Sequence, residues 1–301
     1  MRDIYGVNLY TGTREERLPD FSFDFPYIAS RVNLNEMPGR ETPWHWHKAI
    51  ELFYVEKGYL TYCTPGGETM FQAGMGGLVN TGVLHRTYLG PSAEALAFLH
   101  IFDPSILAGQ PGSRIDQKYI APVVSSGAEI VVLRPEDAAQ SAVLENLRKS
   151  FREEEQAFGY EIRLRSVLST IWVDILACAG SLAESSATQR QTNEKIKTIM
   201  AYVHEHYAER IAVGDLAAIC FSSERECFRL FQNCLHTTPV AYLRSVRLQA
   251  ACRLLEEGRM PVTEIGQLCG LGSSSYFCKV FREAFGCTPQ SYRKKWQDRN
   301  R

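Results

Sequence analysis

The first half of the chain contains a group of residues whose types and spacing suit metal binding. His45 and His47 are separated by one residue, Glu51 follows after three more, and His85 comes later in the same half. Alternate side chains of a β-strand point to one face, so this spacing predicts that His45 and His47 face the same way. With Glu51 and His85 they offer three nitrogen ligands and one oxygen ligand, a set that binds iron, manganese, nickel or zinc. A transition metal at these residues is one prediction, but the sequence alone establishes no cofactor.

The same four side chains have two interpretations that need no metal. They can line the pocket of a small-molecule effector, or they can hydrogen-bond to one another inside a filled interior. Each buried polar group needs a partner in either case, because an unpaired one costs about 1–3 kcal/mol. Aromatic side chains close by could stack on an effector. We therefore predict an effector site, without catalytic residues, that comprises His45, Trp46, His47, Glu51, Tyr54 and His85.

These residues lie in a region whose pattern is typical of short β-strands. Residues 27–133 contain short apolar or alternating runs separated by glycine-rich turns, which predicts a β-sandwich or a barrel. The run Gly39-x5-His45-Trp46-His47-x3-Glu51-x6-Gly58 resembles the first motif of the cupin family, whose fold is a small β-barrel. The second cupin motif is resembled by the run Gly74-x5-Asn80-x-Gly82-x2-His85. Asn80 and Leu89 depart from that motif, where proline and asparagine are usual.

The pattern changes along the rest of the chain. From residue 135 to residue 182 apolar residues recur every three or four positions, which predicts helices. Residues 183–192 are polar, rich in small residues and aperiodic, so we predict a linker there. The prediction is an α+β multidomain fold. It has a cupin-like effector-sensing barrel (1–135), a helical dimerisation segment (136–182), the linker (183–192) and an all-α domain (193–301).

The C-terminal region contains an internal repeat with an offset of 49 to 50 residues. Residues 215–220 match residues 264–269, Phe231 matches Phe281, and Tyr242 matches Tyr292. Each copy reads as a short helix, a turn and a second helix with an inward apolar face. Two such helix-turn-helix units joined by a helix suit two successive major grooves, roughly one helical turn apart. The sequence therefore predicts that residues 193–301 are a tandem helix-turn-helix DNA-binding domain.

Local residues predict how each unit is shaped. Gly266 lies in the middle of a helix, where glycine costs about 1 kcal/mol relative to alanine, so we predict that close helix packing demands it. Ser222 and Ser273 are the predicted N-caps of the two second helices. Gly286 is the predicted left-handed C-cap of the second copy.

Base recognition is predicted at the N-terminal turns of the second helices, because these turns enter the groove. The candidates are Ser223, Glu224, Arg225 and Arg229 in the first unit, and Ser274, Ser275 and Lys279 in the second. Residues 193–301 carry 16 Lys and Arg against 11 Asp and Glu, a net charge of +5, whereas the rest of the chain has −6. A basic segment on a nearly neutral chain favours an anionic partner, here double-stranded DNA.

The C-terminal region resembles the AraC/XylS-type transcription regulators over residues 194–296. The family signature has its likeness in the run from Val262-Thr263-Glu264-Ile265 through Ser275-Tyr276-Phe277 to Thr288-Pro289. Residues 216–248 resemble the upstream copy of that signature. Gly266, Leu271 and His236 depart from the usual alanine, phenylalanine and glycine, and none of them is a predicted groove-facing residue. The resemblance implies DNA binding in tandem major grooves, usually as a dimer, with an effector-sensing N-terminal domain.

We predict a cytoplasmic homodimer without enzymatic activity or membrane association. No signal peptide or membrane-length apolar run is evident, and nine cysteines without a CxxC pair disfavour disulfides and zinc sites. Dimerisation is predicted through residues 136–182, whose apolar face exceeds what the barrel can cover. A cupin-type dioxygenase or isomerase is the enzyme alternative, which two groove-reading units disfavour. A constitutive DNA binder that responds through a partner protein is the third.

Overall fold

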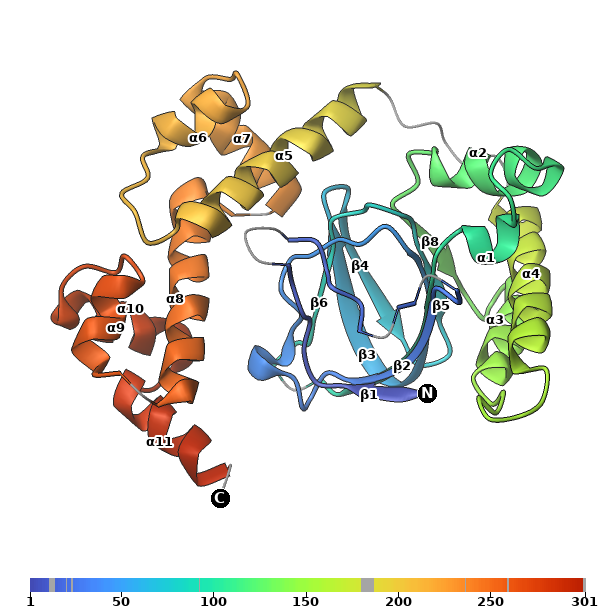
Figure 1. The fold of residues 1–301 in the computed structure, drawn as a ribbon, viewed down its shortest axis with the longest axis horizontal. Coiled ribbons are helices and arrows are strands. Elements are labelled where there is room, and N and C mark those ends of the chain that lie inside the picture. Colours follow the sequence, from blue (N-terminus) through green and yellow to red (C-terminus); the bar gives the residue numbers. More distant parts are fainter. Residues whose placement is uncertain are drawn as a thin grey trace. The chain divides into compact units, whose positions relative to one another are not determined.

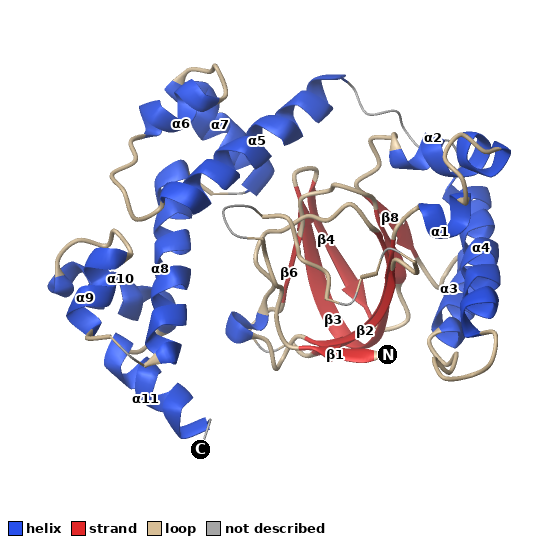
Figure 2. Cartoon of the chain, in the orientation of Figure 1, coloured by secondary structure: helices blue, strands red, loops and turns tan. Residues whose placement is uncertain are grey.

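The protein folds into two units, each with its own core (Figures 1 and 2). The structure, a computed structural model, describes residues 1–10, 14–19, 21–22, 24–91, 93–179, 187–235, 237–258 and 260–299. The first unit comprises residues 1–10 and 14–193, and the second contains residues 194–301. His236 and the first part of the predicted linker, residues 183–186, lie outside the described residues.

An eight-stranded sheet forms the first unit and curls into the predicted cupin-like barrel (Figure 2). Its strands are β1 (Arg2–Ile4), β2 (Tyr27–Asn33), β3 (Ile50–Thr64), β4 (Gly67–Gln72), β5 (Gly76–Val79), β6 (Arg86–Tyr88), β7 (Ala95–Phe102) and β8 (Ile130–Leu133). The strand order is β1-β2-β7-β3-β5-β8, and β4 and β6 also pair with β3. The long strand β3 pairs with β4, β5, β6 and β7, and a register shift between Val55 and Lys57 bends it.

Helices cover one outer face of this sheet. They are α1 (Ser105–Ala108), a π-helical turn (Asp116–Ile120), α2 (Ala121–Val124), α3 (Ala138–Ser150) and α4 (Tyr160–Ala179), and a 3-10 turn (Pro38–Arg40) lies earlier in the chain. Strand β3 separates two cores because its side chains alternate: Leu52 packs with the helices and Phe53 packs inside the barrel. The helical layer thus leaves the barrel interior free to form a site.

A buried hydrogen-bonded chain joins the barrel to helix α3. The Tyr27 hydroxyl lies 2.6 Å from His100 Nδ1, and His100 Nε2 lies 2.7 Å from the Ser150 hydroxyl. Burial lowers the pKa of His100 to about 3, so this imidazole stays neutral at physiological pH. Because Leu99 and Ile101 on the same strand line the barrel interior, β7 links that interior to the helical layer.

The second unit is entirely helical. Its helices are α5 (Ala187–His206), α6 (Val213–Ile219), α7 (Glu224–Leu235), α8 (Pro239–Glu257), α9 (Val262–Leu268), α10 (Ser274–Phe285) and α11 (Pro289–Arg299). The predicted units are α6–α7 and α9–α10, with α8 between them. Residues 187–192, predicted as linker, instead form the first turns of α5. Their sequence shows no apolar period, and Ile196 is the first buried residue among the α5 positions whose side chains are described. None of the described helices is long and apolar enough to cross a membrane.

Helix caps in this unit agree with the prediction at most positions. The Ser273 hydroxyl accepts a hydrogen bond from Tyr276 N, and Gly286 adopts a left-handed conformation (φ 69°) after α10. Ser222 is not the cap of α7, since the Ser223 hydroxyl accepts the bond from Glu226 N and the Glu226 carboxylate accepts one from Ser223 N. This reciprocal pair is a capping box, which places the helix start one residue later than predicted.

Candidate functional site

The four predicted residues meet inside the barrel. His47 Nε2 lies 3.5 Å and His85 Nε2 3.8 Å from Glu51 Oε2, and all four side chains are buried. The segment that carries His45 pairs with the one that carries His85, through backbone hydrogen bonds of 2.9 and 2.8 Å. One ring nitrogen from each histidine lies within 4.8 Å of the other two. His45 lies in an isolated bridge with His85 and His47 lies outside the strands, so the predicted strand alternation does not account for the convergence of these imidazoles.

Backbone carbonyls orient all three imidazoles in the same way. Nδ1 of His45, His47 and His85 lies 2.8 to 2.9 Å from the carbonyl oxygens of Pro43, Ala49 and Val83, respectively. A carbonyl can only accept, so each Nδ1 carries a proton, and each Nε2 has a free lone pair when the ring is neutral. Nε2 of His47 and of His85 has no hydrogen-bond partner among the described residues. Tautomers fixed in this way are typical of metal-binding histidines.

Burial and mutual charge make these groups differ in protonation. Burial lowers the pKa of His85 to about 4, and burial and the other two imidazoles hold the pKa of His45 well below its usual value. Burial would also lower the pKa of His47, but the nearby Glu51 carboxylate raises it overall. The pKa of Glu51 is lowered because its contacts with His47 and His85 outweigh burial, and it also accepts a hydrogen bond from Tyr62 at 2.7 Å. The cluster therefore contains an ion pair and two neutral imidazoles.

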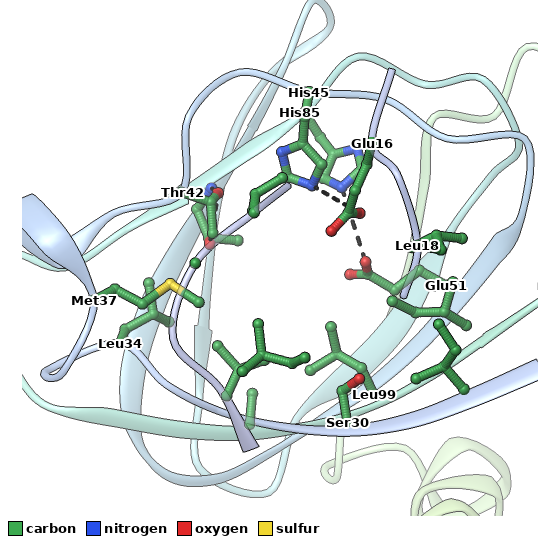
Figure 3. Close-up of a pocket in the computed structure, with 18 of the residues that line it drawn as sticks. Glu16, Leu18, Ser30, Leu34, Met37, Thr42, His45, Glu51, His85 and Leu99 are labelled. Carbon is green, nitrogen blue, oxygen red and sulfur yellow. Dashed lines mark hydrogen bonds and ion pairs between the residues drawn. The ribbon is translucent and has the colours of Figure 1, made fainter. Parts of the chain in front are cut away.

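A cavity of about 70 Å³ adjoins this cluster. His45, His85, Glu16 and Glu51 point toward one another along one wall, and apolar side chains such as Leu34 line the others (Figure 3). Residues 4–8 and 16–19 contribute Ile4, Gly6, Val7, Asn8, Glu16, Leu18 and Pro19 to its lining. The chamber can thus hold a molecule that is polar at one end and apolar elsewhere.

The two second helices of the repeat present their N-terminal turns to solvent. Ser223, Glu224, Arg225 and Arg229 are exposed in the first, as are Ser275 and Lys279 in the second, where Ser274 is half-buried. The buried faces carry other residues, including Cys227 and Phe231 in α7 and Phe277 and Phe281 in α10. Gly266 lets α9 approach α10, because a Cβ there would lie 3.0 to 3.1 Å from Phe277 atoms. These candidate residues thus lie outside the packed core, although Ser223 caps α7 and Arg229 lies 3.8 Å from the Glu226 carboxylate.

Comparisons with known proteins agree with this architecture. A family model described as a helix-turn-helix domain matches residues 216–295, and a cupin domain model matches residues 34–102. The uncharacterized HTH-type transcriptional regulator YdeC of Bacillus subtilis is 24% identical over 273 residues, which are 90% of this chain and 92% of that protein. The HTH-type transcriptional activator RhaS of Klebsiella pneumoniae is 30% identical over 46% of this chain and 50% of its own length.

The chain thus joins a cupin domain to a helix-turn-helix domain, and these two relatives are transcription regulators. HTH-type transcriptional regulator GbdR of Pseudomonas aeruginosa is also similar, at 36% identity over 34% of this chain and 28% of its own length. This chain therefore spans half or less of the last two relatives. Among solved structures, ToxT of Vibrio cholerae aligns over 89% of this chain and 97% of its own, with 13% identity and a TM-score of 0.42.

Three residues predicted in the effector site, Trp46, His47 and Tyr54, do not line the cavity, although His47 lies 3.5 Å from Glu51, which does. Tyr54 has the opposite parity to Glu51 on β3, so it packs toward the helical layer, where the charges of Glu145 and Arg148 act on its hydroxyl. Trp46 lies between His45 and His47 and does not line the cavity. Its backbone instead pairs with the N-terminal segment, through Glu16 N to Trp46 O (2.8 Å) and Trp46 N to Arg14 O (2.9 Å).

Sequence reasoning missed Glu16. Its Oε2 lies 3.8 Å from His45 Nε2, and its side chain is 11% exposed. Burial raises the pKa of this carboxyl to about 7. In the sequence, Glu16 belongs to the charged run Arg14-Glu15-Glu16-Arg17, which is typical of a solvated turn. No local signal distinguishes Glu16 from Glu15, because pairing with the Trp46 segment brings it to the cavity.

Proposed function

We propose that this chain is an AraC-type regulator that binds specific duplex DNA by placing α7 and α10 in successive major grooves. The observation that carries the proposal is the duplicated helix-turn-helix, in which both second helices bury one apolar face and expose a polar N-terminal turn. Arg225, Arg229 and Lys279 supply cations for phosphates or for guanine edges. Because its ligand is DNA, we expect the protein to act in the cytoplasm.

Selection from a random-sequence duplex pool tests DNA recognition directly. The full chain should enrich one motif with two half-sites roughly one helical turn apart. Its affinity for that motif should fall as salt rises, because bound cations displace counterions from the phosphates. Shuffled duplexes of equal composition are the control. A folded chain that binds selected and shuffled duplexes equally would contradict the proposal.

The barrel cavity is the proposed effector site, and it works by binding without turnover. A volume of about 70 Å³ has room for on the order of five water molecules, so a small effector or a slight outward shift of the N-terminal segment suffices. The unpaired Nε2 atom of the neutral His85, which lines the cavity, would accept a hydrogen bond from an effector hydroxyl or amine group. The effector would thereby remove the penalty of burying that nitrogen unpaired.

A thermal-shift screen of small polar-headed molecules identifies such an effector. A molecule that binds the folded barrel alone must raise its melting temperature in proportion to ligand concentration. His85→Ala should abolish that shift, whereas Lys57→Ala, at an exposed position away from the cavity, should keep it. An equal shift in both variants would move the effector elsewhere, and conversion of the molecule into product would favour the cupin-type enzyme instead.

A transition metal is the second candidate occupant, favoured by the three converging Nε2 atoms. His45, His47, His85 and Glu51 offer the donor set, and carbonyl bonds at each Nδ1 already fix the tautomers that a metal needs. Bound metal would supply Lewis acidity and a strong local positive charge. Glu16 lies on the same wall and would feel that charge.

Elemental analysis of protein purified without chelators separates the two occupants. A metal occupant predicts one equivalent of a transition metal per chain, lost in His47→Ala and retained in Lys57→Ala. Metal must displace the proton that the Glu51 carboxylate stabilises on His47, so apparent metal affinity should fall as pH falls through the raised pKa of His47. Metal-free protein that binds an effector through His85 would exclude the metal.

Helices α3 and α4 are the proposed dimerisation segment. On α4, Ile162 is 78% exposed and Val173 54% exposed, and their separation places both on one side of the helix. Most apolar residues of α3 and α4 are buried against the chain's own core, so a second copy would contact Ile162 and Val173 on a largely polar side of α4 and align two DNA-binding units on one operator. The full chain should therefore sediment as a dimer at tens of micromolar (about 10–50 µM), and Ile162→Asp with Val173→Asp should yield a folded monomer. A monomeric wild type would exclude this proposal.

A further inference from the structure

Helix α7 carries an exposed aromatic side chain on its outward side. Phe228 is 42% exposed, although three other apolar residues of the helix, Cys227, Phe231 and Cys234, are buried. It makes no ring contact with another aromatic residue in the described part of the chain. Phe228 is therefore available to a partner.

The neighbours of Phe228 define the kind of partner. Arg225, Phe228, Arg229 and Gln232 follow the i, i+3, i+4, i+7 spacing of one helix side, and all four are exposed. An apolar ring thus lies between two cations on the side of α7 that the proposed function turns toward DNA. Arginines flanking the ring would hold it at the base edges by contacting phosphate or guanine. A protein partner for this ring would need to offer an apolar surface between anionic groups.

We propose that Phe228 contacts the 5-methyl group of a thymine in the half-site that the first helix-turn-helix, α6–α7, binds. Base edges in the major groove are polar except for this methyl group, which apolar side chains contact. The equivalent position in α10 is Cys278, a small side chain, so the preference belongs to the first half-site and not to the second. This inference rests on the proposed DNA-binding function and names the base chemistry that it recognises.

Replacing thymine by deoxyuridine removes the methyl group and leaves base pairing intact. The full chain would be titrated with the selected duplex and with duplexes carrying deoxyuridine at one thymine at a time. The wild type should lose about four-fold in affinity at one thymine of one half-site, the effect of burying a single methyl-sized group. Phe228→Ala should bind the thymine duplex correspondingly less well and should not respond to that deoxyuridine. Phe228→Leu, which keeps an apolar side chain, should retain part of the response.

The variants form a cycle that isolates the contact between ring and methyl group. Equal responses of wild type and Phe228→Ala to deoxyuridine at every thymine would overturn the inference, as would a wild type that responds at none. In both cases specific DNA binding would persist, so the proposed function would stand. A chain that binds no duplex specifically would overturn both. If Phe228→Ala leaves all DNA binding unchanged, the ring serves another partner and the inference also fails.

Discussion

In both helix-turn-helix units, a residue in the turn after the first helix adopts the same left-handed backbone conformation. That residue is a phenylalanine in one unit and a glycine in the other. Phe221 follows α6 with φ 51°, and Gly270 follows α9 with φ 68°, so both residues are left-handed. The next backbone N–H in each unit bonds to the helix, from Ser222 to Ala217 O and from Leu271 to Gly266 O. The turn demands this conformation, which a phenylalanine adopts at a cost of about 1–2 kcal/mol.

Their surroundings explain why one unit tolerates a side chain there and the other does not. A Cβ on Gly270 would lie 2.8 Å from Ala208 O and 3.0 Å from Tyr207 O, where Arg247 also bonds to the Tyr207 carbonyl. Phe221 is 95% exposed. The second turn is therefore packed against the end of α5, whereas the first faces solvent. Repeats with one backbone can thus differ in how firmly they are held.

The largest expected loss of stability comes from removing the buried phenylalanine that both helix-turn-helix units share. Phe231 and Phe281 occupy equivalent positions and are both fully buried, so each change to alanine should cost about 3–5 kcal/mol. Hydrogen exchange of the full chain separates the units: Phe231→Ala should expose α6 and α7 first, and Phe281→Ala α9 and α10. Gln232→Ala, at an exposed position, is the control. A cost several-fold smaller in one unit would mean that the two cores are not equivalent.

Gly270→Ala should be the most damaging change in either turn. It adds a left-handed strain and a clash with two backbone carbonyls, together about 2–4 kcal/mol. Exchange protection should fall at α9, α10 and the end of α5 together. Gly272→Ala provides the control, because it has a similar φ of 71° but open space around it. Equal losses in both variants would show that backbone strain, and not packing, distinguishes the turns.

The units should also differ in how they recognise bases. Arg225 and Ser275 are equivalent, exposed positions in the N-terminal turns of α7 and α10. Arg225→Ala should weaken binding to the selected duplex by about 1–3 kcal/mol and relax preference at one or two base pairs, if the guanidinium grips a guanine. Ser275→Ala, which removes no charge, should have the smaller effect. A uniform loss across all sequences would reassign Arg225 to phosphate contact.

Phe221→Gly should give the smallest effect and the opposite sign. Removing the left-handed strain of an exposed phenylalanine outweighs the extra freedom of glycine in the unfolded chain, for a gain of about 0.5–1 kcal/mol. Exchange protection of α6 should rise while that of α9 stays constant. Destabilisation by this change would mean that the Phe221 ring makes a stabilising contact, which its exposure argues against.

The sequence by itself determined the elements whose signals are local. Apolar periodicity and the internal repeat located both helix-turn-helix units, and the change of offset from 49 to 50 residues corresponds to turns of unequal length, residues 220–223 and 269–273. Motif spacing predicted that His45, His47, Glu51 and His85 lie in one cluster, although His45 and His47 lie outside the strands. Each of these inferences uses only neighbours along the chain, or a repeated pattern, so the residue order contains the information.

Only the tertiary structure decided which other residues join the site. Glu16 reaches the cavity through pairing with the Trp46 segment, thirty positions later in the chain, and Tyr54 leaves it because β3 must also cover the helical layer. Residues 187–192 belong to α5 although their sequence is polar and aperiodic. Phe221 and Gly270 adopt the same left-handed conformation in equivalent turns, but contacts with the end of α5 exclude a side chain at Gly270. Contacts between distant segments decide such features, and no local pattern of side chains encodes them.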